Sequence, residues 1–149
     1  MRSRPHADRR LSSDLTRWRS VNEEYISMPV KLNRTGYDYA KKLIEEGHAV
    51  LDERDDWSEH QPSAQTKNRF IQENGFPEYR KWHLGVAEGQ SPSNKRVYKF
   101  PFGDFKNVHR CAVLAAESRA AQYKYLDIEL ATAHLHGMLE VLDSLRQQN

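Results

Sequence analysis

Two long helical segments joined by three residues constrain this chain more than any other feature of its sequence. Residues 126–146 place apolar side chains at the spacing of one buried helix face. Residues 105–122 are rich in alanine, and Asp104 is suited to cap their start. Because the connection, residues 123–125, is short, we predict that the two helices pack side by side and antiparallel. The apolar positions of the second helix are Ile128, Ala131, Leu135, Met138, Leu139 and Leu142.

Capping signals upstream predict three shorter helices. A helix start needs a side chain that accepts from the first free backbone amides, and glycine favours a helix end. Thr35 with Asp38 has the spacing of a capping box. Ser63 is a second cap, and Pro77 suits a first helical turn. The helices expected from these signals span residues 36–46, 64–73 and 77–84, and they are followed by Gly47, Gly75 and Gly85.

Strand signals are few. Residues 96–100 alternate polar and apolar side chains before Pro101, and residues 49–51 are short and apolar. These two segments could pair with each other. We therefore predict a mainly α fold: a compact domain of four to five helices, with room for one short two-stranded β-hairpin as a minor α+β element.

Charge and composition divide the chain near Met28. The chain has 149 residues, a mass of 17.4 kDa and a net charge of +2, which suits one domain. Residues 1–27 hold six arginines and four acids, so they account for the whole net charge. We predict an N-terminal extension over residues 1–27 and a single helical domain over residues 28–149. The extension is disordered or forms a single docking helix; a basic arm for nucleic acid is disfavoured by its interleaved acids. The docking helix would align Leu11, Leu15, Trp18, Val21 and Tyr25 on one face.

Several protein classes are excluded or disfavoured by what the sequence lacks. The single cysteine, Cys111, cannot form an internal disulfide, which favours a reducing compartment and a cytoplasmic location. No apolar run is long enough for a membrane-spanning helix, so no membrane partner is expected. Residues 28–149 carry balanced charge, so nucleic acid is a disfavoured partner.

Seven histidines raise the question of a metal site. His134 and His136 lie about 200° apart around a predicted helix, so they cannot bind one ion together. The same spacing separates His109 from Cys111. No CxxC or HExxH motif is present, and no metal or other cofactor is expected. We interpret Cys111 as a small buried apolar residue rather than a nucleophile.

Five aromatic and imidazole side chains form the candidate pocket of this chain. Tryptophans with adjacent histidines can line a polar and aromatic site, but both rings can equally be core anchors, which is the favoured alternative. The pocket hypothesis requires Trp57, His60 and His83 to converge on one cleft. The candidate residues are Trp57, His60, Trp82, His83 and His109.

Arg119 is a separate candidate. In a helix that begins at Phe105, its side chain falls within the apolar stripe that contains Val108 and Ala112. An unpaired buried charge is costly, so we expect Arg119 to form a structural ion pair. Its candidate partners are Glu45, Asp127 and the acidic run in residues 52–56.

Five segments of the domain have a distinctive sequence: residues 35–44, 55–63, 81–85, 98–111 and 115–119. Together they resemble a family of small uncharacterised bacterial proteins whose function is unknown. The resemblance covers about residues 32–142 and leaves out the residues before Met28. It implies a bacterial protein and no particular activity, so it assigns no site residue.

These observations favour a non-enzymatic module that binds another protein or associates with itself, because no catalytic motif is present. If a helix in the extension mediates self-association, deleting residues 1–27 will change the mass of the protein in solution. The alternative is a small enzyme or ligand-binding protein that uses the candidate pocket.

Overall fold

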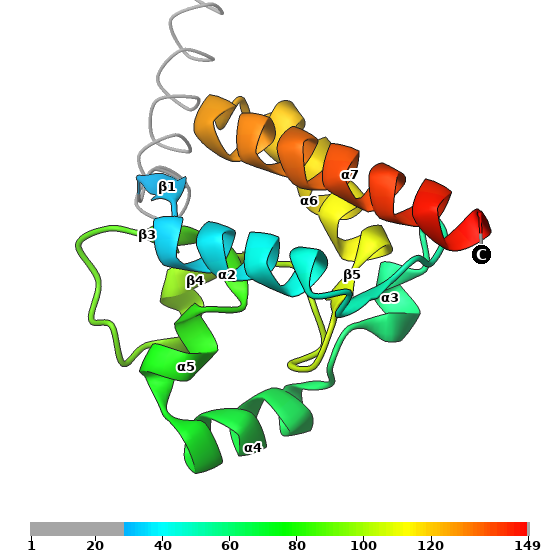
Figure 1. The fold of residues 1–149 in the computed structure, drawn as a ribbon. Helices are drawn as coiled ribbons and strands as arrows, with labels where there is room; N and C mark the ends of the chain where they lie inside the picture. The colour runs from blue at the N-terminus through cyan, green and yellow to red at the C-terminus, as the bar shows by residue number, and fades with distance from the viewer. Residues whose placement is uncertain (1–28, 149) are drawn as a thin grey trace, which may run out of the picture.

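The structure, a computed structural model, describes residues 29–148 and has a mixed α+β fold (Figure 1). The expected mainly α domain of four to five helices is wrong: these residues contain six α-helices, a three-stranded antiparallel sheet and a two-stranded parallel sheet. The predicted extension, residues 1–27, lies outside the described residues.

In chain order the elements are β1 (Val30–Leu32), α2 (Arg34–Glu45), β2 (Ala49–Val50), α3 (Trp57–His60), α4 (Ala64–Asn74), α5 (Phe76–Arg80), β3 (His83–Ala87), the 3-10 helix η1 (Lys95–Val97), β4 (Tyr98–Pro101), β5 (Val108–His109), α6 (Arg110–Tyr123) and α7 (Leu126–Gln147).

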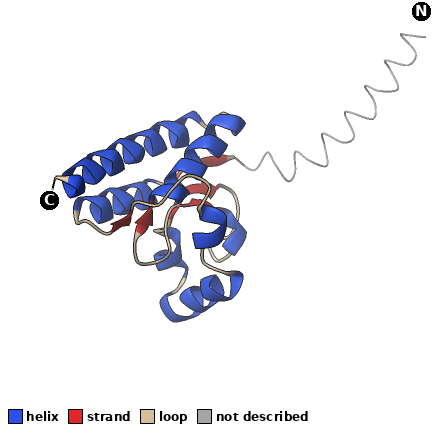
Figure 2. Ribbon diagram, turned by 90° about the vertical axis from the view of Figure 1, so that its right-hand side faces the viewer, coloured by secondary structure: helices blue, strands red, loops and turns tan. Residues whose placement is uncertain are grey.

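The strands lie between the long helix pair and the smaller helices (Figure 2), with β1 at an edge. In the main sheet, β3 is central and pairs antiparallel with β1 on one side and β4 on the other. In the smaller sheet, β2 and β5 run parallel. The expected hairpin between residues 49–51 and 96–100 does not form, because each segment pairs with a different strand.

The segment around Gly85 shows why the expected helix at residues 77–84 is wrong. Pro77 lies in the first turn as predicted, but α5 ends at Arg80 and the following residues form β3. Pairing on both edges of this strand outweighs the local helix signal. Gly85 does not end a helix: a Cβ here would lie 2.8 Å from the ring of Phe100, so glycine permits the neighbouring strand to approach closely.

The antiparallel helix pair is confirmed, with a later start than expected. The helices α6 and α7 pack against each other (Figure 1). The first begins at Arg110 rather than Phe105, because a turn precedes it. In that turn the Asp104 carboxylate accepts from the amides of Lys106 and Asn107 at 3.0 and 2.8 Å. Phe105 has a φ of 69°, which a helix does not permit.

The two predicted caps upstream differ in outcome. Ser63 caps α4 as expected. The N-cap of α2 is Asn33 rather than Thr35. The Asn33 side chain donates hydrogen bonds of 2.9 Å to the backbone carbonyls of Arg80 and His83. These bonds tie the start of α2 to the start of β3.

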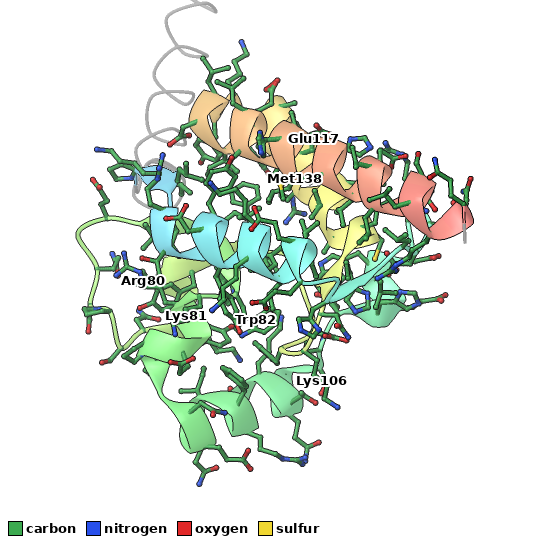
Figure 3. The ribbon with its side chains drawn as sticks, viewed as in Figure 1. Arg80, Lys81, Trp82, Lys106, Glu117 and Met138 are labelled. Carbon is green, nitrogen blue, oxygen red and sulfur yellow. The ribbon has the colours of Figure 1, made fainter. Side chains whose placement is uncertain are left out.

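The main core lies between α2, α6, α7 and the sheet. Trp82 belongs to this core and lies near the middle of the molecule (Figure 3). Its ring contacts Tyr39 of α2 and Phe102, with 5.3 and 5.5 Å between centroids. Among residues 29–148 no helix has both the length and the apolar character needed to cross a bilayer. A second cluster is formed by Tyr79, Val97 and Tyr98.

Gly36 offers a direct test of how α2 lies on β3. A Cβ at this position would overlap the carbonyl oxygen of His83, so the helix would have to move away from the strand. We expect Gly36→Ala to lower the free energy of unfolding by at least about 2 kcal/mol, measured by urea denaturation. Thr35→Ala, at an exposed site in the same turn, is the control and should change it by less than about 0.5 kcal/mol. Equal stability of the two variants would contradict this packing.

Candidate functional site

The buried carboxylate of Asp52 is the centre of the candidate site. Only 5% of its side chain is exposed. Its Oδ2 accepts from Nδ1 of His109 at 2.7 Å and from Nδ1 of His60 at 2.8 Å, and the thiol of Cys111 donates to the same oxygen at 3.0 Å. Its Oδ1 accepts from the backbone amide of Cys111 at 2.7 Å. We call Asp52, His60, His109 and Cys111 the Asp52 cluster.

Strand pairing assembles the cluster from distant parts of the chain. Parallel pairing places Val50 of β2 beside His109 of β5, so Asp52 lies next to the start of α6. His109 is extended, with φ −107° and ψ 126°, whereas Cys111 lies in the first helical turn. A backbone that changes from strand to helix between them can direct both side chains to one carboxylate. The separation expected from helical spacing is therefore wrong.

His109 lies between two carboxylates. Its Nδ1 faces Asp52, and its Nε2 lies 2.9 Å from Oδ2 of Asp104. An ionised carboxylate only accepts hydrogen bonds, so each ring nitrogen faces a group that can accept from it. Asp104 is held in turn by the two backbone amides of its own turn. The orientation of the imidazole ring is therefore set from both sides.

Arg110 holds the backbone that carries Asp52. Its Nε donates to the carbonyl of Asp52 at 2.9 Å, and its Nη2 donates to the carbonyl of Leu51 at 3.1 Å. Its Nη1 forms ion pairs with Asp143 at 3.2 Å and Glu140 at 3.4 Å on α7. The guanidinium thus ties the segment after β2 to the helix pair.

The electrostatics of the cluster keep a charge on Asp52 and a proton on Cys111. Burial by itself would raise the pKa of Asp52, but hydrogen bonds from Cys111, His109 and His60 together hold it well below its usual range. Burial, and then the neighbouring Asp52, raise the pKa of the Cys111 thiol far above its usual range. A reactive cysteine needs a lowered pKa and access to substrate, and Cys111 is only 1% exposed. The cluster therefore holds no thiolate nucleophile.

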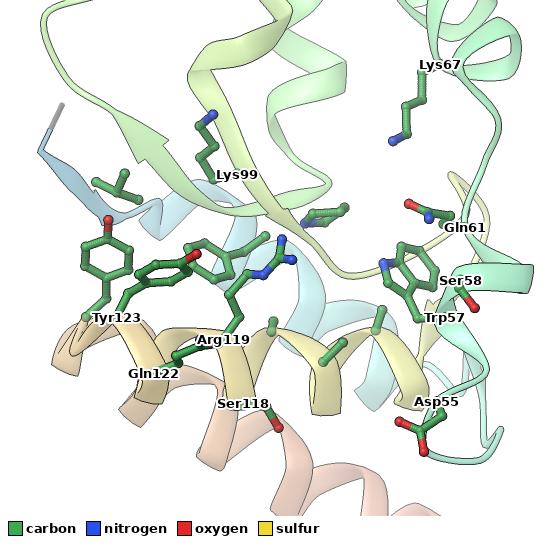
Figure 4. A pocket seen from close by; sticks show the side chains of 17 residues that line it. Asp55, Trp57, Ser58, Gln61, Lys67, Lys99, Ser118, Arg119, Gln122 and Tyr123 are labelled. Carbon is green, nitrogen blue, oxygen red and sulfur yellow. The ribbon is translucent and has the colours of Figure 1, made fainter. Parts of the chain in front are cut away.

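A cleft of about 900 Å³ lies beside the cluster (Figure 4). Alanines of α6 line part of it, and Trp57 lies at one end. The Trp57 ring also borders the Asp52 cluster, with its centroid 5.9 Å from that of His109. The polar side chains that line the cleft include Asp55, Gln61, Lys67, Lys99, Arg119 and Gln122.

Three of these side chains, Lys67, Lys99 and Arg119, are cationic. Within residues 29–148 no carboxylate oxygen lies within 4.0 Å of their charged groups. Burial and the nearby charge of Lys95 lower the pKa of Lys67. Arg119 is exposed on the cleft side of α6, so the expected structural ion pair does not form among these residues. The reason is that the predicted apolar stripe faces an open cleft instead of a covering element.

The structure brings three of the five candidate pocket residues together. The ring centroids of His60 and His109 are 5.6 Å apart, and that of Trp57 is 5.9 Å from His109. Trp57 is half-buried between the cluster and the cleft rather than in the core. His60 and His109 meet at Asp52, which the sequence analysis did not single out, and Trp57 lies against His109.

The other two candidates lie elsewhere. Trp82 is 4% exposed and packs in the core, as the alternative interpretation expected. His83 is 3% exposed and contacts the rings of Tyr79 and Tyr98, at centroid distances of 4.5 and 5.9 Å. His83 therefore belongs to the second aromatic cluster and takes no part in the Asp52 cluster.

Sequence reasoning missed Asp52, Asp104 and Arg110. Asp52 begins an acidic run, which is typical of a solvated surface. Asp104 has the appearance of a helix cap, and Arg110 that of a polar helix residue. Asp52 and His109 are 57 positions apart, and no local pattern predicts that their strands pair.

Comparison with family models, curated proteins and solved structures found no match to this chain. The resemblance to a family of small bacterial proteins stays a prediction.

His83 gives a pH-dependent prediction. Burial, opposed by the hydrogen bond from Nδ1 to the Tyr79 carbonyl, lowers its pKa from 6.5 to about 4. The unfolded chain therefore binds a proton between these values while the folded chain does not. The contribution of His83 to the free energy of unfolding is complete above pH 6.5. It falls by about 1.4 kcal/mol for each pH unit between pH 6.5 and pH 4.

We expect His83→Asn, which keeps a hydrogen-bond donor near the position of Nδ1, to lose this fall in stability with falling pH. Urea unfolding at pH 7 and pH 5 will show a drop in stability that is about 2 kcal/mol smaller for the variant than for the wild type. The other histidines contribute equally to the pH dependence of stability in the wild type and in the variant. An identical pH dependence would mean that His83 titrates normally in the folded state.

Proposed function

We propose that the protein binds a small organic anion with a flat ring in the cleft beside α6. The observation that carries this proposal is the group of three cations, Lys67, Lys99 and Arg119, that line one cleft without a carboxylate partner among the described residues. Cations that line one partly enclosed space create a positive potential in it, so an anion that binds there is favoured. Among the described residues that line the cleft, Asp55 is acidic, compared with these three cations.

The shape of the cleft supports a ligand with a planar group. Ala112, Ala115 and Ala116 present only methyl groups from α6, which leaves a smooth surface against which a ring can lie. Trp57 stands at one end and Tyr123 at the other, with Arg119 between them (Figure 4). Aromatic side chains bind flat rings by stacking, while a guanidinium binds phosphate, sulfonate or carboxylate with two parallel hydrogen bonds.

The size and chemistry of the cleft favour binding over catalysis. Its volume, about 900 Å³, is in the range of pockets that hold small molecules. Among the described residues no imidazole or thiol lines the cleft, and these residues offer no nucleophile or general base of those types there. A ligand-binding protein that uses this cleft is therefore preferred to an enzyme. The cleft is not the candidate pocket of the sequence analysis, because His83 does not converge with Trp57 and His60.

A second candidate function, self-association, is supported by the outer face of α7. Leu126, Leu130, Val141 and Leu145 are each more than half exposed and follow one stripe of the helix. Gly137 lies in the same stripe with open space beside it. Leu130 and Val141 are equally far from the middle of the stripe, as are Leu126 and Leu145. An antiparallel copy of the helix could therefore meet the same residues in reverse order, as a two-fold dimer requires.

The ligand proposal is tested with 1-naphthyl phosphate and its neutral counterpart, 1-naphthol. We expect the phosphate to shift the indole N–H signal of Trp57 in NMR spectra, and 1-naphthol to bind at least about tenfold more weakly. Arg119→Gln and Lys99→Gln should each weaken binding of the phosphate about tenfold, because each removes a charged hydrogen bond.

The matched control is Arg69→Gln, which removes an exposed positive charge from α4 outside the cleft and should leave the affinity unchanged. Equal affinity for the phosphate and the alcohol, or equal loss in all three variants, would contradict an anion site at this cleft.

The self-association candidate is tested by analytical ultracentrifugation of the full chain. We expect a species of twice the 17.4 kDa monomer mass, and a monomer when Leu130→Lys and Val141→Lys are combined, because two charges would be buried at the interface. The control combines Gln65→Lys and Gln72→Lys, which adds the same charge at exposed sites on α4.

A monomeric wild type would rule out this interface. A dimer that survives both α7 substitutions but is lost on deletion of residues 1–27 would assign self-association to the predicted extension instead.

A further inference from the structure

Four side chains of the Asp52 cluster converge as metal ligands do. One ligand atom from each of Asp52, His60, His109 and Cys111 lies within 4.8 Å of all the others. We propose that this cluster binds one divalent transition-metal ion of the zinc type. The proposal concerns a site separate from the ligand cleft and stands independently of it.

The distances fit a tetrahedral ion. Two nitrogen or oxygen ligands about 2.1 Å from zinc are about 3.4 Å apart, and a nitrogen and a sulfur ligand are about 3.6 Å apart. The Sγ of Cys111 and Nδ1 of His60 are 3.9 Å apart, close to this value. The separations from Asp52 Oδ2, between 2.7 and 3.0 Å, are shorter because hydrogen bonds draw the groups together. Outward shifts of about half an ångström would make room for the ion.

The hydrogen bonding around Oδ2 of Asp52 supports the same conclusion. Nδ1 of His109, Nδ1 of His60 and the thiol of Cys111 all lie within 3.0 Å of this one oxygen. A carboxylate oxygen offers about two lone-pair positions, so three donors exceed its capacity. A cation among these atoms relieves the crowding, because it accepts electron pairs from all four groups at once.

The ligand types select the ion. Two imidazoles, one thiolate and one carboxylate suit zinc, whereas calcium and magnesium prefer oxygen ligands alone. On binding, the thiol proton and the protons on the two Nδ1 atoms leave to solvent, while each imidazole carries one proton on Nε2. The negative charges of Asp52 and of the Cys111 thiolate then balance the charge of a divalent ion. A neutral site of this kind suits the burial of Asp52, His109 and Cys111.

Asp104 lies where metal sites usually place an outer carboxylate. A histidine that binds a metal through one nitrogen commonly donates from the other to a carboxylate, which fixes the orientation of its ring. His109 would bind through Nδ1, and its Nε2 already lies 2.9 Å from Oδ2 of Asp104. Arg110 adds support by holding the carbonyls of Leu51 and Asp52.

The position of the site indicates a structural role. Four protein ligands leave no free position for water or substrate. The ligands come from the segment after β2, from α3, from β5 and from α6. The helix α3 contains no buried residue, so polar contacts and the ion would hold it in place. Because α3 carries Trp57, the ion would also fix one end of the cleft.

The proposal is tested on the untagged full chain, first stripped with a chelator and then titrated with Co²⁺. We expect one Co²⁺ per chain, with the visible absorption of a tetrahedral ion and a near-ultraviolet thiolate-to-cobalt band, both abolished by one equivalent of Zn²⁺. Native mass spectrometry should show one zinc ion per chain, and zinc should raise the unfolding temperature.

Variants identify the ligands. Cys111→Ser should remove the near-ultraviolet band and weaken Zn²⁺ binding at least about 100-fold, and His60→Gln, at the most exposed ligand, should weaken it similarly. Asp104→Asn should weaken binding about tenfold by acting on His109 alone. His48→Gln, at an exposed histidine outside the cluster, should change nothing. Circular dichroism establishes that each variant is folded before titration.

Two results would overturn the proposal. One is a folded wild-type chain that takes up no stoichiometric Co²⁺ or Zn²⁺. The other is binding whose affinity and spectrum are unchanged in Cys111→Ser and His60→Gln, since that would place the ion at a different site. Neither result depends on whether 1-naphthyl phosphate binds in the cleft.

Discussion

The buried charge of Asp52 is the constraint on which the rest of this structure depends. A carboxylate out of water is tolerated only when hydrogen bonds or a cation replace its hydration. Here the partners come from α3, β5 and the first turn of α6, so satisfying one side chain fixes three elements at once. Arg110 completes the arrangement by linking the carbonyls next to Asp52 with two acids of α7. The short helix α3 contains no buried residue, so it owes its position to these polar contacts more than to apolar burial.

The helix α6 connects this polar centre to the rest of the molecule. One face packs against α7, while another lines the cleft. Its alanines serve both purposes, since small side chains permit close helix packing and leave space where no element covers the helix. The proposed ligand, the proposed ion and the proposed dimer use different surfaces of the α6–α7 pair. All three can therefore operate in the same molecule without competing for residues.

The sequence predicted part of the candidate site and missed its centre. Trp57, His60 and His109 were recognisable as aromatic and imidazole groups that could act together, and the structure brings them to one place. Asp52 was not recognisable, because an acid in a run of acids has the pattern of a surface loop. His83 illustrates the opposite error: it stands beside a tryptophan in sequence, but strand β3 directs it into the second aromatic cluster. Arg119 was correctly placed on a face of α6, but whether that face is covered depends on elements far away in the chain.

The sequence by itself determined α4, α7 and the side-by-side packing of the two long helices. The spacing of apolar residues over α7, the short connection before it and the Ser63 cap of α4 act within a few residues, so their signals are local and can be read directly. Only the tertiary structure decided the strands and the site. Residues 83–87 form a strand because two partners pair with them, and β2 meets β5 across more than fifty intervening residues. The energy of such pairing depends on contacts between segments distant in sequence, and it is this pairing that converts an acid, two histidines and a cysteine into one site.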